Sequence, residues 1–206
     1  VSLGVPVRAI DEAVPVASDP MVVSAVDVLR FFRASSTERN TIFLRLLSSP
    51  LGGLYPAEIR WVRRLAAQHK QSPLSLAQNA DSLGSLMPRV AEAVLGLASR
   101  LHELEAHGDR PPDEILWRIC AWAEGRPQDA PGVPAAFRAL LDEVSRIARD
   151  APSTTANDIL RLFDAGHFQE ISVVPPNSRD GIHLATIHQA RGKEWRYVFV
   201  PNVVED

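Results

Sequence analysis

The sequence has 206 residues, of which 46% are hydrophobic, and a formal net charge of -3 at pH 7. A chain of this length and apolar content can bury the core of one large or two modest domains, which excludes a disordered or low-complexity protein. The slightly acidic balance excludes a global attraction to nucleic acid or to anionic membranes, so any such binding must come from local patches.

Cys120 is the single cysteine, so no intrachain disulfide can form, and a reducing, cytoplasmic compartment is expected. No apolar run approaches the roughly 20 residues of a membrane span, and no membrane partner is expected. The histidines lack the spacing of a shared metal site, so no metal ligand is predicted. The chain starts at Val1 rather than Met and ends at Asp206, and we interpret both ends as cuts from a longer protein.

The first predicted elements are a short strand in GVPVRAI (4–10) and a helix with Asp19 as N-cap and Pro20 at its first position. Thr37 is predicted to cap a second helix, which ends at SSP (48–50). Apolar residues recur at helical spacing in both helices, which predicts one buried face for each. These residues are Val22, Val26, Leu29, Phe32, Ile42, Phe43, Leu46 and Leu47.

Further helices are predicted to start at Pro56, near SLAQNA, at Pro88 and after Pro112, with two more between 135 and 166. Thr155 and Asp158 have the spacing of a capping box. The predicted buried residues include Val90, Val94, Leu97, Leu101, Leu104, Ile115, Ile119, Phe137, Leu140, Leu141, Val144, Ile147, Ile159, Leu162 and Phe163, with Trp61, Trp117 and Trp122 as core anchors.

Two strands are predicted at the end of the chain, in IHLATI (182–187) and RYVFVP (196–201). Because one strand cannot satisfy its own backbone, the first strand and these two are expected to share a small sheet. This arrangement makes residues 13–179 a helical subdomain inserted into a domain formed by 1–12 and 180–206. The predicted fold class is therefore mostly α with a small β portion.

A polar turn, TIHQARGKEW (186–195), lies between these two strands. Ligands of open α/β sheets bind beyond the carboxyl ends of strands, which is where this turn begins. Thr186 and His188 are alternate residues that suit contacts to the phosphates or sugars of a nucleic-acid strand. Arg191 can bind a phosphate bidentately. A polar turn with internally satisfied side chains would contain the same residue types, so both interpretations stay open.

The same turn also has features of a nucleotide site. Gly192 permits close approach of the backbone to a ligand, and Glu194 can accept hydrogen bonds from ribose hydroxyls. One helical turn here would direct free N–H groups toward an anion.

A second candidate site lies in SSPLGGLYPAEI (48–59), where Gly52 and Gly53 can adopt positive φ. Arg60 and Arg64 share one face of the following helix at a spacing of four residues. A helix after a glycine hairpin can present backbone N–H groups and arginines to the phosphates of a duplex. A solvated helix face would look the same in sequence.

These stretches resemble segments of one protein family. GIHLATIHQARGKEWRYVFVPNVVED resembles motif V of the UvrD/PcrA/Rep group of superfamily 1A helicases, Thr-x-His-x-Ala-Lys-Gly-x-Glu-aromatic between two strands. GVPVRAIDEAVPVASDPMVVSAVDVLRFF is similar to the family segment Gly-Ile-Pro-Tyr-x-Val followed by a helix ending Leu-Arg. SSPLGGLYPAEI resembles the Thr-Pro-x-x-Gly-Ile-Gly hairpin of the family's inserted subdomain, called 2B.

The resemblance implies a fold and an activity. Family members have two RecA-like motor domains of the P-loop NTPase kind, with ATP between them, single-stranded DNA across them, and the second domain, 2A, interrupted by 2B. Residues 1–12 and 180–206 would be parts of 2A, and 13–179 would be 2B. The parent would be an ATP-dependent 3′-to-5′ DNA helicase of DNA repair or recombination, with ATP and Mg as cofactors and single-stranded DNA, duplex DNA and repair proteins as partners.

The resemblance also implies roles for single residues. Thr186 and His188 would touch DNA, while Arg191, Gly192 and Glu194 would serve the nucleotide. Gly52 and Gly53 would belong to the duplex-binding hairpin of 2B. Arg191 replaces the family's Lys, so its contact geometry can differ.

The sequence contains no G-x-x-x-x-G-K-[ST] phosphate loop, and no Asp-Glu pair is assigned to magnesium. The fragment alone is therefore predicted to lack catalytic residues, to bind neither ATP nor Mg, and to be inactive. Two alternatives remain: a subunit of a helicase–nuclease of the AdnAB or RecB kind, and a non-enzymatic helical interaction module.

Overall fold

A computed structural model describes the chain at residues 7–9, 14–106, 110–124, 134–173, 182–184, 191 and 197–200. These residues are mostly helical, with little strand, so the predicted predominance of helix is confirmed. The chain divides into two compact units, Val1–Glu12 with Val174–Asp206, and Ala13–Val173. The assignment of residues 1–12 and 180–206 to one domain and of 13–179 to an inserted subdomain stays a prediction.

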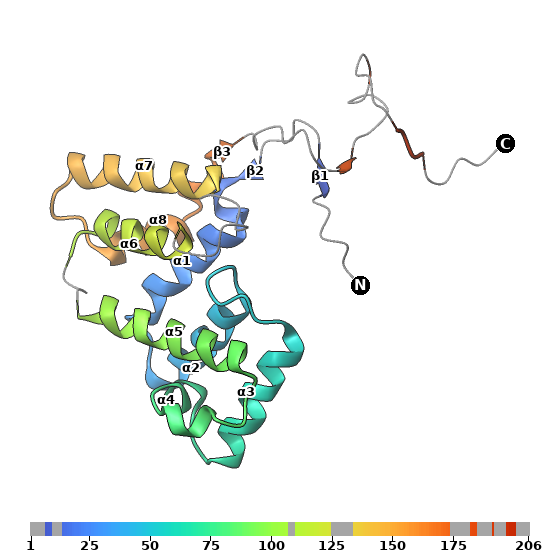
Figure 1. Ribbon diagram of the computed structural model, residues 1–206. Helices are drawn as coiled ribbons and strands as arrows, with labels where there is room; N and C mark the ends of the chain where they lie inside the picture. The colour runs from blue at the N-terminus through green and yellow to red at the C-terminus, as the bar shows by residue number, and fades with distance from the viewer. Residues whose placement is uncertain are drawn as a thin grey trace. The chain divides into compact units, whose positions relative to one another are not determined.

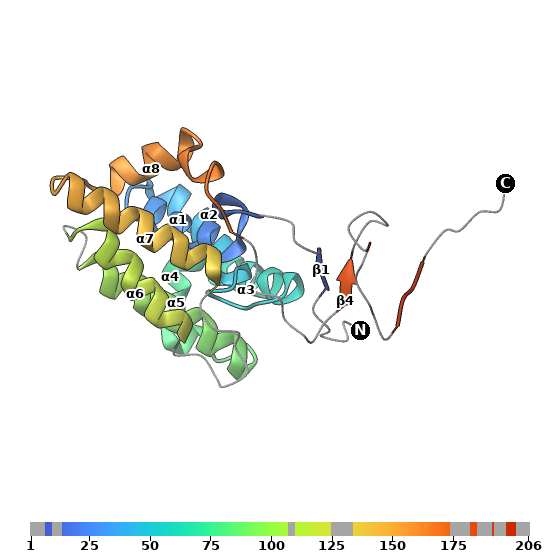
Figure 2. The ribbon, with the colours of Figure 1, turned by 90° about the horizontal axis from the view of Figure 1, so that it is seen from above.

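Among the described residues of the unit formed by the two chain ends, one pair of strands is present. β1 (Val7–Ala9) pairs in parallel with β4 (Ile182–Leu184), with Val7 opposite Ile182 and Ala9 opposite Leu184 (Figure 2). The predicted pairing of the first strand with the penultimate one is confirmed. Two parallel strands must be joined by a long crossover connection. The connection between β1 and β4 contains the whole helical unit.

The last predicted strand, RYVFVP, is wrong for the residues that the structure describes. Residues 197–200 adopt no strand, and Phe199 is 89% exposed. The apolar run at residues 197–200 is a property of the side chains, whereas a strand also requires a neighbouring backbone to complete its ladder. The pattern alone therefore could not establish a third strand.

The described residues of the helical unit include eight α-helices and three short 3-10 helices (Figure 1). The α-helices are α1 (Pro20–Phe31), α2 (Ser36–Ser48), α3 (Pro56–Gln68), α4 (Pro73–Ala77), α5 (Pro88–Glu105), α6 (Pro112–Glu124), α7 (Ala135–Asp150) and α8 (Ala156–Asp164). The 3-10 helices are η1 (Val16–Ser18), η2 (Ala80–Leu83) and η3 (His167–Gln169).

Most of the predicted helix starts are confirmed. Asp19 caps α1 by accepting a hydrogen bond from the backbone N–H of Met21 at 2.8 Å, and Thr155 and Asp158 form the predicted capping box of α8. The predicted cap of α2 is wrong: Ser35, not Thr37, is the N-cap. The carboxylate of Glu38 accepts the backbone N–H of Ser35 at 2.9 Å, and this reciprocal bond fixes the helix start two residues earlier.

The core of the helical unit forms around α1. This helix packs against α2, α7 and α8; α6 packs on α7, and α4 contacts α2, α3 and α5 (Figures 1 and 2). The predicted apolar faces are buried or partly buried in a single cluster. Phe43, Phe137 and Phe168 are its largest fully buried side chains.

The tryptophans correct one expectation. Trp61 and Trp117 are 44% and 57% exposed, so neither is a core anchor, whereas Trp122 packs partly buried against the core. In α3 the buried stripe includes Ile59, Val62 and Leu65, and position 61 lies at the edge of this stripe, one turn before Leu65.

A second strand pair, which the sequence did not predict, brings the two ends of the helical unit together. β2 (Val14–Pro15) pairs antiparallel with β3 (Ser172–Val173). The backbone N–H of Val16 extends the contact by donating to the carbonyl of Ile171 at 2.8 Å. The first and last residues of the helical unit therefore lie side by side.

Candidate nucleic-acid interface

The predicted glycine hairpin lies between α2 and α3 (Figure 1). Gly53 has φ of 69°, in the region that favours glycine. A Cβ on Gly52 would lie 2.3 Å from the carbonyl oxygen of Leu47, so no side chain fits there. Both glycines therefore have a structural reason to be present, and the prediction of positive φ is confirmed for Gly53.

The backbone N–H groups of the hairpin are occupied within it. Gly52 and Gly53 donate to the carbonyl of Ser49 at 3.1 and 2.8 Å, and Leu54 donates to the carbonyl of Leu47 at 2.9 Å. The N–H of Leu51 donates to Ser49 Oγ at 3.1 Å. Phosphate contacts by these amides would require the hairpin to open, so binding near this hairpin falls to the side chains beside it.

Those side chains are on α3. Its buried side includes Ile59, Val62 and Leu65, and its exposed side presents Arg60, Arg63 and Arg64, which we call the α3 arginine face. Arg60 and Arg64 lie one turn apart, as the sequence predicted. Glu58, the one acidic residue of α3, is buried and therefore does not compensate the charge of this face at the surface.

Among the described residues, the arginine face lacks ion pairs. None of the ion pairs within the described part of the chain includes Arg60, Arg63 or Arg64. Most other described arginines of the helical unit have carboxylate partners, and these are Arg30, Arg39, Arg45, Arg89, Arg110, Arg118, Arg146 and Arg161. The face is thus a local positive patch on a chain of net negative charge.

A clamp fixes the hairpin and the start of α3 against α5. Nη2 of Arg89 lies 3.2 Å from Oε2 of Glu58 and 3.3 Å from the carbonyl oxygen of Gly53. The same guanidinium lies over the ring of Tyr55, 5.4 Å from its centroid, and Glu58 accepts the N–H of Tyr55 at 2.7 Å. These contacts hold the first turn of α3 rigid, which lowers the entropy that a ligand would have to remove.

A groove of about 420 Å³ borders the clamp. Gly52 and Gly53 line one side, and Gly96 of α5 lines the other with Arg89 and Arg100. A Cβ on Gly96 would meet no heavy atom within 4 Å, so its position opens directly into free space.

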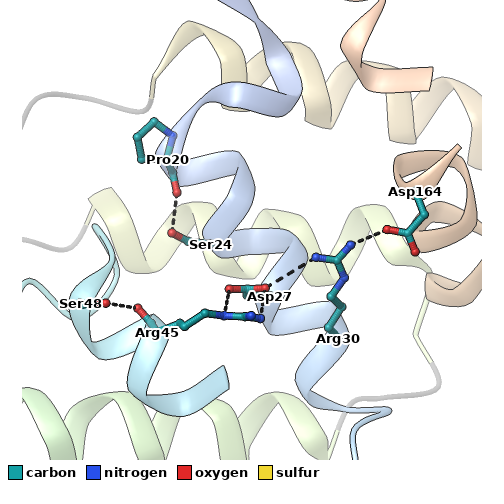
Figure 3. Close-up of polar contacts among 7 residues, drawn as sticks. All are labelled: Pro20, Ser24, Asp27, Arg30, Arg45, Ser48 and Asp164. Carbon is teal, nitrogen blue, oxygen red and sulfur yellow. Dashed lines mark hydrogen bonds and ion pairs between the residues drawn. The ribbon is translucent and has the colours of Figure 1, made fainter. Parts of the chain in front are cut away.

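A second groove, of about 480 Å³, lies between α1, α2 and α8 and is lined by Arg30, Arg33, Arg45, Arg161 and their neighbours. Figure 3 shows the ion pairs of two of these arginines, Arg30 and Arg45. Asp27, 6% exposed, accepts hydrogen bonds from Nε and Nη2 of Arg45, while Arg30 bridges from Asp27 to Asp164. Because carboxylates neutralise most of these arginines, we interpret the network as a structural connection between the three helices.

Another carboxylate has a strongly shifted pKa. Bidentate hydrogen bonds from Arg146, together with a contact from His167, lower the pKa of Glu143 on α7 to about 2 against the opposing effect of burial. The Nε2 of His167 lies 2.7 Å from Oε1 of Glu143. This pair ties η3 to α7 and lies apart from the α3 arginine face in sequence, so we assign it to stability.

Among the predicted site residues, Gly52 and Gly53 lie in the hairpin, and Arg60 and Arg64 lie on the helix that follows it. Arg191 is exposed. Thr186, His188, Gly192 and Glu194 lie outside the described residues.

Sequence reasoning missed two contributors to this region, Trp61 on the exposed side and Arg89 in the clamp. The signal that could have revealed Trp61 was its position at the edge of the apolar stripe of α3. The contacts of Arg89 join segments more than thirty residues apart, and periodicity carries no information about them.

No protein-family model matches the sequence, and no curated protein matches it either. Within the described residues, no helix has both the length and the apolar character that a membrane crossing requires.

Proposed function

We propose that this chain is a segment of an ATP-dependent 3′-to-5′ DNA helicase of the UvrD/PcrA/Rep group, and that its helical unit docks on duplex DNA. The observation that carries the docking proposal is the α3 arginine face. Arg60, Arg63 and Arg64 are exposed, lack carboxylate partners among the described residues, and lie beside a rigid glycine hairpin.

Phosphate binding follows from the chemistry of this face. Guanidinium groups bind phosphates through paired N–H donors, and each neutralised phosphate releases counterions. Arg60 and Arg64, one turn apart on a helix held by the Glu58–Arg89 clamp, can contact phosphates of one backbone without prior ordering of the main chain. Such contacts position a protein on DNA without reading sequence.

The helicase assignment is supported by the chain order of the elements as well as by the sequence resemblance. β1 and β4 are adjacent and parallel, and the helical unit between them begins and ends at the β2–β3 pair. An insertion into one motor domain requires this order. In the proposal, residues 1–12 and 180–206 belong to motor domain 2A. Thr186 and His188 contact single-stranded DNA, and Arg191, Gly192 and Glu194 serve the nucleotide.

Charge reversal tests the docking proposal. Arg60→Glu/Arg64→Glu in the 206-residue chain is expected to weaken binding of a labelled DNA duplex at least tenfold in fluorescence anisotropy. The matched control is Arg138→Glu/Arg149→Glu, which reverses two exposed arginines on α7. Circular dichroism verifies that both variants fold. Equal losses of affinity in the two variants would show that the effect comes from the net charge of the chain and not from a contact at α3. An unchanged affinity in the α3 variant would reject the interface.

A separate measurement tests the helicase assignment. In the complete helicase of this proposal, His188→Ala and Glu194→Ala are expected to abolish most DNA-stimulated ATP hydrolysis. Hydrolysis that is unchanged in both variants, or absent from the unmodified protein, would reject the assignment while leaving the docking result intact.

A further inference from the structure

The groove of about 480 Å³ lies between α2 and α8, two helices that both pack on α1, and we call it the α2–α8 groove. The residues that line each wall recur mostly at spacings of three or four, which places them on one face of their helix. They are Glu38, Thr41, Ile42 and Arg45 on α2, and Asn157, Leu160, Arg161 and Asp164 on α8. Each wall spans two helical turns, about 10 Å, which matches about three residues of an extended peptide.

The floor of the α2–α8 groove is apolar. Ile42 and Leu160 each keep 7% of their surface exposed, more than most residues of the core, and Ala34 is half-buried after the end of α1. An apolar floor with a few polar groups in the walls is typical of sites that bind ligands of moderate size. One aliphatic side chain of a partner can therefore bury its surface there.

Arg33 lines this groove without a carboxylate partner among the described residues. Hydrogen bonds from Thr155 lower the pKa of Asp158, and the charges of Arg161 and Arg33 add to this effect, so both guanidinium groups act on one carboxylate. That carboxylate is already occupied. Its Oδ2 accepts the N–H and the Oγ–H of Thr155 at 2.9 and 2.7 Å, and its Oδ1 lies 3.5 Å from Nη1 of Arg161. The positive charge of Arg33 is therefore left uncompensated.

Arg45 offers further donors in addition to those of Arg33. It donates to Asp27 through Nε and Nη2, as Figure 3 shows, and its side chain is still 54% exposed. A guanidinium carries five N–H donors, so the Nη1 group of Arg45 can bind a second carboxylate. Arg30, in contrast, already bridges Asp27 and Asp164. The groove thus combines two available guanidinium groups with an apolar floor.

The carboxylates of the lining argue against a nucleic acid as the occupant. Glu38 and Asp164 lie in the two walls, and hydrogen bonds from Ser35 lower the pKa of Glu38, which keeps it charged at neutral pH. A row of phosphates would meet these charges, whereas the acidic residue of α3, Glu58, is buried beneath the α3 arginine face. A short peptide carries its charges on separate side chains and can avoid them.

We propose that the α2–α8 groove binds an acidic segment of a partner protein. One apolar side chain of the segment packs on Ile42 and Leu160, and the flanking carboxylates accept hydrogen bonds from Arg33 and Arg45. Arginine binds carboxylates through paired, charge-assisted hydrogen bonds. Because Arg33 has no ion pair to give up among the described residues, the partner gains this contact without breaking another. The site lies on other helices than the α3 arginine face and does not depend on docking to DNA.

The test is an NMR titration of the isotope-labelled 206-residue chain with the capped pentapeptide Glu-Asp-Leu-Asp-Glu. A second capped peptide, Glu-Asp-Ser-Asp-Glu, has the same charge but no apolar side chain. We expect saturable shifts at the backbone amides of Arg33, Thr41 and Asn157 with the leucine peptide. The serine peptide should bind about tenfold more weakly, because it leaves the floor of the groove uncovered.

The variants separate binding in the groove from general charge. Arg33→Glu should weaken binding of the leucine peptide about tenfold, and Thr41→Trp, which fills the groove, should do the same. Arg138→Glu is the matched control because it makes the same charge change at an exposed residue of α7, and its effect should stay below about twofold. Arg60→Glu/Arg64→Glu should also retain peptide binding, which distinguishes this site from the proposed DNA interface.

Four outcomes would overturn the inference. These are no saturable binding of the leucine peptide, equal binding of the two peptides, equal losses in Arg33→Glu and Arg138→Glu, and shifts that map to the α3 arginine face instead of the groove. Circular dichroism verifies that each variant folds. If Arg33→Glu does not fold, Arg33→Gln carries the same prediction with a loss of about fivefold, because it removes the charge without reversing it.

Discussion

The carboxylate of Asp27 on α1 accepts two hydrogen bonds from the guanidinium of Arg45 on α2, one from Nε at 3.0 Å and one from Nη2 at 2.7 Å. Asp27 is 6% exposed, and a charge so far removed from water requires a partner. The packing of the two central helices therefore depends on a residue pair as well as on apolar contact.

Removal of the partner should expose this dependence. Arg45→Ala leaves the Asp27 carboxylate buried with only the more distant Arg30, 3.9 Å away. We expect the free energy of unfolding to fall by about 2 kcal/mol, less than for a fully buried pair because the Arg45 side chain is 54% exposed. Urea denaturation followed by circular dichroism measures the change.

Arg161→Ala is the control for that experiment. Arg161 pairs with Asp158 at 3.5 Å, but its side chain is 75% exposed. Its removal should change the free energy of unfolding by less than about 0.5 kcal/mol. Similar losses of unfolding free energy in Arg45→Ala and Arg161→Ala would show that the burial of Asp27 does not determine the cost of removing its partner.

Two glycines should respond to alanine in opposite directions. Gly96 lies inside α5 with open space at its Cβ position, so Gly96→Ala should stabilise the chain by about 1 kcal/mol through higher helix propensity. Gly52→Ala places a Cβ 2.3 Å from the carbonyl oxygen of Leu47 and should destabilise it by about 3 kcal/mol. Thermal melting gives both signs, and a stabilised Gly52→Ala would contradict the hairpin geometry.

The salt dependence of DNA binding should report the number of phosphates that α3 contacts. If Arg60 and Arg64 each neutralise one phosphate, Arg60→Ala/Arg64→Ala should reduce the slope of log affinity against log salt concentration by about 2. Arg138→Ala should leave this slope unchanged. Weaker binding with an unaltered slope would indicate that the two arginines shape α3 without touching phosphate.

The Glu143 pair should produce a specific dependence of stability on acid pH. Arg146 and His167 lower the pKa of Glu143 from 4.5 to about 2. The folded state thus binds protons less readily than the unfolded state, so the stabilisation is complete above pH 4.5 and disappears as the pH falls toward 2. Urea midpoints of the unmodified chain and Glu143→Gln should differ at pH 5.5 and converge near pH 2.

Glu92→Gln is the matched control because Glu92 is exposed and belongs to none of the ion pairs among the described residues. Its midpoint should follow that of the unmodified chain throughout. A gap between the unmodified chain and Glu143→Gln that persists at pH 2 would contradict the lowered pKa of Glu143.

Local sequence information was sufficient for most of the helices. Asp19 before Pro20, Thr155 before Asp158 and the apolar spacing from Val90 to Leu104 each act within one or two turns, and the structure confirms all three. The cap of α2 could have been assigned in the same way, because Glu38 lies three residues after Ser35. The sequence also placed Arg60 and Arg64 on one helix face, since a spacing of four residues fixes that relation.

Tertiary structure alone decided what each exposed or charged residue does. Asp27 with Arg45, Glu143 with His167, and Arg89 with Glu58 and Gly53 are pairs separated by many residues, and no periodicity encodes them. The absence of a strand at residues 197–200 has the same origin, because strand pairing depends on a distant backbone. Helix formation is governed by neighbours along the chain, whereas charge compensation and sheet pairing are governed by neighbours in space.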